Sequence, residues 1–141
     1  MIRMTRKIYF CGSIRGGRDD RDLYERLINN LRQYGEVLTE HIADKDLFEK
    51  EKLDDKGIHD RDMDWLISSD AIVAEVTQPS LGVGYEIGRA VALNKKILCL
   101  FRPESGKHLS AMIAGANNGS NFVVKNYEET QASEIFKQFF S

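Results

Sequence analysis

Short apolar runs alternate with amphipathic segments along most of the chain. The apolar runs are mostly continuous, as in strands covered on both faces, and predict strands at residues 7–11, 36–41, 71–76, 97–101 and 122–125. Helical periodicity predicts helices at about residues 19–33, 56–68, 82–94, 109–115 and 133–140. This alternation predicts a parallel sheet with right-handed crossovers. We therefore expect an α/β fold: a single doubly wound, Rossmann-like domain over residues 1–141, with a five-stranded parallel sheet flanked by helices.

The composition and charge of the chain argue against two kinds of binding partner, nucleic-acid polymers and membranes. The chain has 20 Lys and Arg against 22 Asp and Glu, a formal net charge of -2, so it attracts neither a nucleic-acid polymer nor an acidic membrane. No apolar stretch approaches the roughly 20 residues of a membrane span, and no signal-peptide core follows the charged start. Cys11 and Cys99 lie in apolar runs, which indicates buried thiols of a reducing compartment. We expect a cytoplasmic and nuclear location.

The segment after the third predicted strand has the features of an anion site. Pro79 ends the strand, and Ser80 places a hydroxyl where the next helix begins. Gly82 and Gly84 let a ligand approach the backbone. A helix N-terminus offers free amides and the positive end of its dipole, which suits phosphate. The spacing matches neither a P-loop nor a dinucleotide-binding motif. In this fold ligands bind at the carboxyl ends of the strands, so this segment is the first candidate.

Glu86 follows in the same predicted helix. On a helical wheel it shares a face with Val83, Ala90 and Leu93. A carboxylate on an apolar face must be paired, protonated or part of a site. The alternative, a surface carboxylate that only complements the helix dipole, does not explain this orientation.

Asp62 has a similar setting in the preceding predicted helix. Asp60 and Asp64 fall on the polar face, whereas Asp62 lies on the apolar face beside Trp65 and Leu66. Two interpretations stay open at this point. Asp62 is either a packed carboxylate with a partner elsewhere, or the second member of a functional pair with Glu86.

Two inward carboxylates beside an anion site suit the cleavage of a sugar–base bond. One carboxylate can attack C1' while the other protonates the leaving base, as in retaining glycosidases. We expect Glu86, near a helix N-terminus, to stay ionised and act as nucleophile. We expect Asp62, beside apolar side chains, to have a raised pKa and act as acid.

The segment after the first predicted strand adds polar groups. Tyr9 lies in an otherwise apolar strand, and Ser13 and Arg15 follow it; a guanidinium is well suited to bidentate contact with phosphate. The alternatives are a core aromatic for Tyr9 and a surface charge for Arg15. His41, at the end of the second predicted strand, is either structural or part of the same crevice. No cluster of His, Cys and Asp has metal-ligand spacing, so we expect neither a metal nor a cofactor.

Three long strings, at residues 8–17, 76–86 and 97–103, carry a resemblance to a known family. They resemble the vertebrate 2'-deoxynucleoside 5'-phosphate N-hydrolases, which are similar to nucleoside 2-deoxyribosyltransferases. The resemblance runs from about residue 7 to 139. It is broken at residues 44–56, a charged, weakly periodic stretch that predicts a mobile loop with a partial helix and leaves base selection open.

The resemblance implies a metal-free hydrolase that releases a free base and 2-deoxyribose 5-phosphate. Glu86 then forms the covalent deoxyribosyl intermediate, Asp62 protonates the base, and Tyr9 orients the nucleophile and sugar. It also implies a homodimer, in which Ser110 completes the neighbouring subunit's phosphate pocket, and a nucleotide-pool role on 5-hydroxymethyl-dUMP. The expected substrate-binding residues are Ser13, Ile14, Arg15, Gly16, His41, Ser80, Gly82, Ser110 and Met112.

Two other functions stay open. A nucleoside 2-deoxyribosyltransferase passes the sugar to a second base, but its 5'-hydroxyl substrate gives the predicted phosphate site around Ser80 and Gly82 nothing to bind. A nucleotide-binding sensor without turnover gains nothing from two carboxylates near a phosphate.

Overall fold

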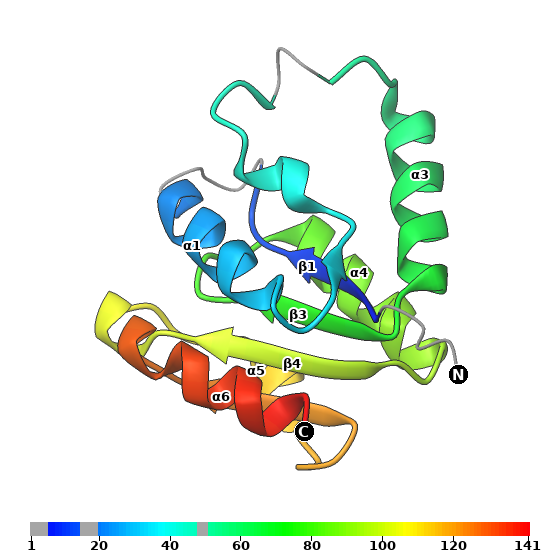
Figure 1. Ribbon diagram of the computed structural model, residues 1–141. Helices are drawn as coiled ribbons and strands as arrows, with labels where there is room; N and C mark the ends of the chain where they lie inside the picture. The colour runs from blue at the N-terminus through cyan, green and yellow to red at the C-terminus, as the bar shows by residue number, and fades with distance from the viewer. Residues whose placement is uncertain (1–5, 15–19, 48–50) are drawn as a thin grey trace.

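The computed structural model describes residues 6–14, 20–47 and 51–141 (Figure 1). The strands are β1 Lys7–Cys11, β2 Glu36–Val37, β3 Ala71–Glu75, β4 Lys96–Phe101 and β5 Phe122–Asn126. The helices are α1 Arg21–Leu31, α3 Asp55–Ser68, α4 Leu81–Ala92, α5 Ala111–Gly115 and α6 Ala132–Phe139. Three 3-10 turns are η1 Glu40–Ala43, η2 Pro103–Ser105 and η3 Glu129–Gln131. No helix in these ranges is long and apolar enough to cross a membrane.

All strands pair in parallel in the order β2-β1-β3-β4-β5, which confirms the predicted α/β fold. The chain starts at β1, moves outward to β2, and then crosses back to β3 on the other side of β1. The strand order therefore reverses between β1 and β3, and this is the point at which a crevice opens beyond the strands. The register there pairs Ile8 with Ala71 and Cys11 with Ala74, so both strands end side by side.

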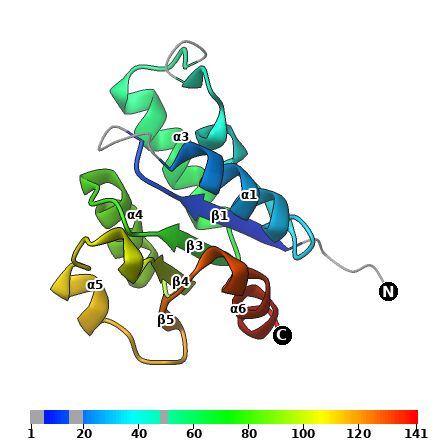
Figure 2. The ribbon, with the colours of Figure 1, turned by 90° about the vertical axis from the view of Figure 1, so that its left-hand side faces the viewer.

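Helices cover both faces of the sheet (Figure 2). On one face, Leu27 of α1 and Phe136 of α6 pack with Ile8 and Phe10 of β1. On the other face, residues of α3 and α4 pack against the alternate strand positions, in a cluster that includes Tyr9, Met63, Leu66, Val83, Ile87 and Ala90. Burial on both faces explains why the strands are continuous apolar runs. Cys11 and Cys99 are buried and free, as expected.

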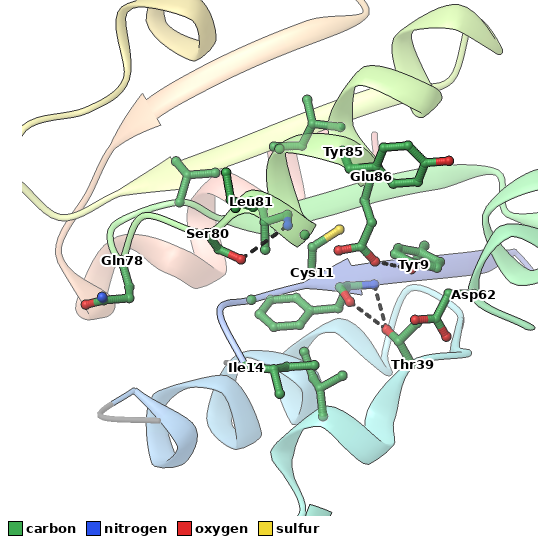
Figure 3. A pocket seen from close by; sticks show the side chains of 18 of the residues that line it. Tyr9, Cys11, Ile14, Thr39, Asp62, Gln78, Ser80, Leu81, Tyr85 and Glu86 are labelled. Carbon is green, nitrogen blue, oxygen red and sulfur yellow. Dashed lines mark hydrogen bonds between the residues drawn. The ribbon is translucent and has the colours of Figure 1, made fainter. Parts of the chain in front are cut away.

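The structure corrects the second predicted strand. Regular pairing ends at Val37, and His41 lies in η1 rather than at a strand end. The Thr39 side chain explains the early end, because its hydroxyl accepts from the Phe10 amide at 2.9 Å and donates to the Phe10 carbonyl at 2.7 Å. A side chain thus takes over the ladder bonds of β1 where a longer strand would continue. Figure 3 shows these two bonds at the edge of the cavity.

The predicted loop at residues 44–56 falls partly outside the described residues, which omit 48–50. Leu47 before the gap is buried, and α3 starts at Asp55, earlier than predicted. Asp54 caps α3 by accepting from the Gly57 amide at 2.8 Å.

Candidate active site

A cavity of about 1080 Å³ opens beyond the carboxyl ends of β1 and β3, where the strand order reverses. Its walls come from β1, η1, α3, α4 and the segment that precedes α5. The predicted site residues that line it are Tyr9, Ile14, His41, Asp62, Ser80, Gly82, Glu86, Ser110 and Met112. The structure therefore brings together residues from widely separated parts of the sequence.

Glu86 and Tyr9 meet at the floor of the cavity (Figure 3). Glu86 projects from the second turn of α4 toward β1, and the Tyr9 hydroxyl donates a hydrogen bond to its Oε2. Tyr9 is fully buried, and burial together with the Glu86 charge raises the pKa of its phenol, which keeps the proton on the donor. Tyr9 thus fixes the direction of one carboxylate oxygen and leaves Oε1 for a ligand. Val83 and Ala90 are buried beside Glu86, whereas Leu93 at the end of α4 is half exposed.

The electrostatics of Glu86 differ from the expectation that it stays ionised. Burial raises the pKa of Glu86 from 4.5 to about 7; the Tyr9 hydrogen bond opposes this shift and the Asp62 charge adds to it. The helix N-terminus does not prevent the shift, because desolvation of a carboxylate outweighs a partial dipole charge. Near neutral pH both the protonated and the ionised forms of Glu86 are therefore populated.

Asp62 lies on α3 and faces the same cavity, near Tyr9 and Glu86 (Figure 3). Its surroundings are less apolar than the helical wheel predicts. The side chain is 23% exposed, and Oδ1 accepts from the Nε of Arg61 at 3.1 Å. Asp60 and Asp64 are exposed on the opposite face of α3, as expected. The two inward carboxylates are thus on separate helices that flank one cavity.

One end of the cavity lies at the start of α4, where the sequence predicts an anion site. The Ser80 hydroxyl caps this helix, accepting from the Val83 amide at 3.3 Å, as Figure 3 shows. Within the described part of the chain, a methyl group added at Gly82 would meet only Ser80 Oγ, at 3.9 Å. The backbone amides of a first helical turn have no partners inside the helix. The geometry can therefore receive a phosphate at Ser80 and Gly82.

Ser13 lies beyond β1 with an unusual hydrogen-bonding state. Its hydroxyl is buried and has no hydrogen-bond partner among the described residues, while its amide donates to the Tyr24 hydroxyl at 2.9 Å. The same ring explains Gly12, because an added methyl group there would lie 2.6 Å from Tyr24. Arg15 and Gly16, which were predicted to bind the ligand, lie outside the described residues.

The other predicted residues occupy the rim. Ser110 is exposed, lines the cavity of its own chain and caps α5 by accepting from the Met112 amide at 3.2 Å. Met112 is 83% exposed. His41 is half buried, with its ring 5.4 Å from that of Trp65. No group of three or more His, Cys, Asp and Glu in the described ranges could hold a metal ion.

Sequence reasoning missed two charged residues. Arg61 contacts Asp62, Glu51 and His41, but its position next to a candidate acid was the only signal. Glu75 ends β3 fully buried, within a run of apolar residues, and accepts from the Arg102 Nε at 3.2 Å and from the Tyr127 hydroxyl. A lone carboxylate in a buried strand requires such partners, so Glu75 could have been singled out.

The buried Glu75 has a structural role rather than a place in the cavity. Arg102 also pairs with Asp20, the residue that precedes α1. Tyr127 follows β5 directly, so these four groups tie together the ends of β3, β4 and β5 and the start of α1. Replacement of one partner would leave a buried charge uncompensated.

The comparisons with known proteins agree with this geometry. The family model described as nucleoside 2-deoxyribosyltransferase matches residues 8–131. A 5-hydroxymethyl-dUMP N-hydrolase of Tetraodon nigroviridis is 57% identical over 138 residues, which cover 96% of this chain and 97% of the relative. The 5-hydroxymethyl-dUMP N-hydrolase of Homo sapiens is 58% identical over 136 residues, which cover 94% and 78%.

A solved structure with the same fold is the CMP N-glycosidase of Clostridium botulinum, with a TM-score of 0.70 and 22% identity over 95% of this chain and 99% of that one. The chain belongs to the nucleoside 2-deoxyribosyltransferase family. Within that family, the relatives described above at 57–58% identity are named as N-hydrolases.

Proposed function

We propose that this protein hydrolyses the N-glycosidic bond of 2'-deoxynucleoside 5'-monophosphates, including 5-hydroxymethyl-dUMP, to a free base and 2-deoxyribose 5-phosphate. The observation that carries the proposal is one cavity with a hydrogen-bonded carboxylate at its floor, a second carboxylate on the facing helix and a helix N-terminus at its end. The relatives named as 5-hydroxymethyl-dUMP N-hydrolases support the choice of substrate. Such an enzyme would remove modified nucleotides from the pool; its cytoplasmic and nuclear location stays a prediction.

In the proposed mechanism each group has a step. The ionised Glu86 attacks C1' of the deoxyribose and forms a glycosyl ester, while Asp62 gives its proton to the leaving base. Asp62, now a carboxylate, takes a proton from water, whose oxygen attacks C1' and releases Glu86. Tyr9 holds Glu86 in line throughout by its hydrogen bond to Oε2. No step requires a metal or cofactor.

The first test is product analysis with a 2'-deoxynucleoside 5'-monophosphate, the matching ribonucleotide and the matching nucleoside. We expect free base from the deoxynucleotide, and much less from the other two compounds. Transfer of the sugar to an added base in preference to water would favour a deoxyribosyltransferase instead. Binding without release of any base, with 5-hydroxymethyl-dUMP included, would favour a nucleotide sensor.

We also propose that the active unit is a homodimer. The exposed surface of α4 carries apolar side chains: Leu81 is 98%, Tyr85 46% and Val91 49% exposed, and the first two also line the cavity. A methyl group added at Gly84 or Gly88 on this helix would meet no atom of the described residues within 4 Å. Met112 extends the apolar surface beside Ser110. A second copy packed on this face would bury these side chains and bring its Ser110 close to the site.

Complementation tests whether Ser110 acts in the neighbouring site. Glu86→Gln removes the nucleophile, and Ser110→Asp places a charge that repels phosphate while it still caps α5. We expect each variant to be inactive and a refolded mixture to regain roughly a quarter of wild-type activity, because statistical pairing gives one intact site in half the dimers. A monomer in light scattering, or a mixture that stays inactive, would contradict the shared site.

A further inference from the structure

Arg61 is a charged side chain of the cavity wall to which the proposed reaction gives no role. It lines the cavity from α3, directly before Asp62, and its side chain is 24% exposed. Among the described lining residues it is the one Lys or Arg, beside the four carboxylates of Glu51, Asp55, Asp62 and Glu86. A guanidinium in such a place is either a charge that neutralises the wall or a group that holds particular side chains.

The contacts of Arg61 decide between these two possibilities. Its Nε donates to Asp62 Oδ1 at 3.1 Å. Its Nη1 lies 3.2 and 3.0 Å from the two carboxylate oxygens of Glu51. Its Nη2 lies 3.3 Å from the Nε2 of His41. Each nitrogen of the planar fork therefore has its own partner, and the partners come from α3, η1 and the segment before α3.

The guanidinium itself is held from several sides. It lies over the ring of Trp65, 4.9 Å from the centroid, one turn further along α3. Burial and the neighbouring Arg61 charge lower the pKa of His41, so the imidazole is neutral and can accept from Arg61. Burial alone would raise the pKa of Glu51, but hydrogen bonds from the Leu53 amide and Arg61 lower it. The neutral imidazole of His41 and the ionised carboxylate of Glu51 can thus both accept hydrogen bonds from the Arg61 guanidinium.

We infer that Arg61 is a positioning residue for Asp62: clamped by Glu51, His41 and Trp65, it holds one oxygen of the acid and so directs the other toward the base. The inference rests on the proposed role of Asp62. The carboxyl group of an aspartate that acts as acid must lie within hydrogen-bond reach of the atom that it protonates on the base at the moment of cleavage. Bonding of Oδ1 to a fixed nitrogen leaves Oδ2 to face the base.

The test asks whether Arg61 acts by positioning Asp62 or only by maintaining the structure of the cavity. In the first turnover of a natural nucleotide the base must be protonated. In the first turnover of 4-nitrophenyl 2-deoxyriboside 5-phosphate the leaving phenolate needs no proton. We expect Arg61→Ala to lower the first rate roughly 10- to 100-fold and the second by less than about 3-fold, since it acts through the acid only. Equal losses on both substrates would mean that Arg61 only maintains the cavity, and would overturn the inference.

A double-mutant cycle gives a second readout. In the Asp62→Asn background, Arg61→Ala should have little further effect on the natural nucleotide, because the group that it positions is gone. Additive losses would overturn the inference. Glu51→Gln weakens the contact that holds Arg61 without changing Asp62, and it should reproduce part of the loss. This variant replaces Arg61→Ala in the test if Arg61→Ala proves too unstable to assay. Arg26→Ala removes an ion pair with Glu129 that is more exposed and lies away from the cavity, and it serves as the control.

This experiment also distinguishes failure of the proposed function. If Asp62→Asn by itself leaves cleavage of the natural nucleotide unchanged, Asp62 is not the acid and the proposed mechanism fails before Arg61 is considered. If Asp62→Asn abolishes that cleavage while Arg61→Ala does not affect it, the mechanism stands and the positioning role is wrong.

Discussion

Glu86→Gln is expected to lower turnover of 5-hydroxymethyl-dUMP by at least about 1000-fold while the nucleotide still binds within a few-fold of the wild-type affinity. The amide keeps the shape of Glu86 and its contact with Tyr9, but it cannot attack C1'. Single-turnover release of base and calorimetric titration of the nucleotide measure the two quantities. Asp64→Asn, on the exposed face of α3, is the control and should change neither. Unchanged turnover in Glu86→Gln would remove Glu86 from the mechanism.

The raised pKa of Glu86 adds two pH-dependent results. Because the nucleophile must be ionised, the first-turnover rate with 4-nitrophenyl 2-deoxyriboside 5-phosphate, which needs no acid, should rise with pH through about 7. The folded pKa lies above the unfolded value of 4.5, so protonation of Glu86 stabilises the fold; this stability is present below 4.5 and is lost as pH rises through about 7. Glu86→Gln should therefore be roughly 1 to 3 kcal/mol more stable than wild type at pH 8, and similar to it at pH 4. Denaturant unfolding at both values measures the difference.

This pairing of activity with instability follows from the position of Glu86. A nucleophile at the floor of a cavity is desolvated, which makes the ionised form costly in the free protein. The free-energy cost of burying the Glu86 carboxylate is offset within the same helix, because Val83, Ile87 and Ala90 are buried against the sheet. This packing keeps α4 in place although Glu86 destabilises it.

The fold could be predicted from the sequence because burial on both faces has a clear signature. The continuous runs of β1, β3, β4 and β5 were each placed to within one residue. The second strand was overestimated because its pattern continues beyond Val37 while Thr39 takes over the backbone bonds of Phe10. A side chain that replaces a strand bond has no periodicity, so pattern reasoning could not find it.

The sequence predicted which residues line the candidate site better than it predicted their pKa values and contacts. Glu86 and Asp62 were found because a carboxylate on an apolar face is unusual, and both line one cavity. The raised pKa of Glu86 was not anticipated because its burial depends on β1 and α3, which a helical wheel does not include. The contacts of Arg61 were missed because Glu51 and His41 lie in other segments, which only the fold brings together.

Asp62→Asn is expected to lower the first turnover of a natural nucleotide by about 100- to 10,000-fold, because the base then leaves without a proton. The variant should behave differently with 4-nitrophenyl 2-deoxyriboside 5-phosphate. Formation of the Glu86 ester needs no acid with this probe, but its hydrolysis still needs Asp62 to accept a proton from water. We expect a rapid burst of nitrophenolate, equal to the number of sites, followed by slow turnover.

The burst separates the role of Glu86, which forms the ester, from that of Asp62, which is needed to hydrolyse it. Mass spectrometry of the stalled protein should show a deoxyribose 5-phosphate adduct on the peptide that contains Glu86, and hydroxylamine should release it as expected for an ester. Asp60→Asn, two residues away on the exposed face of α3, is the matched control and should turn over the probe without a burst. A variant at Asp62 that hydrolyses the probe steadily, with no adduct, would mean that water attacks C1' directly. Glu86 would then act as a base or an electrostatic stabiliser, and the nucleophile in the proposed mechanism would be water.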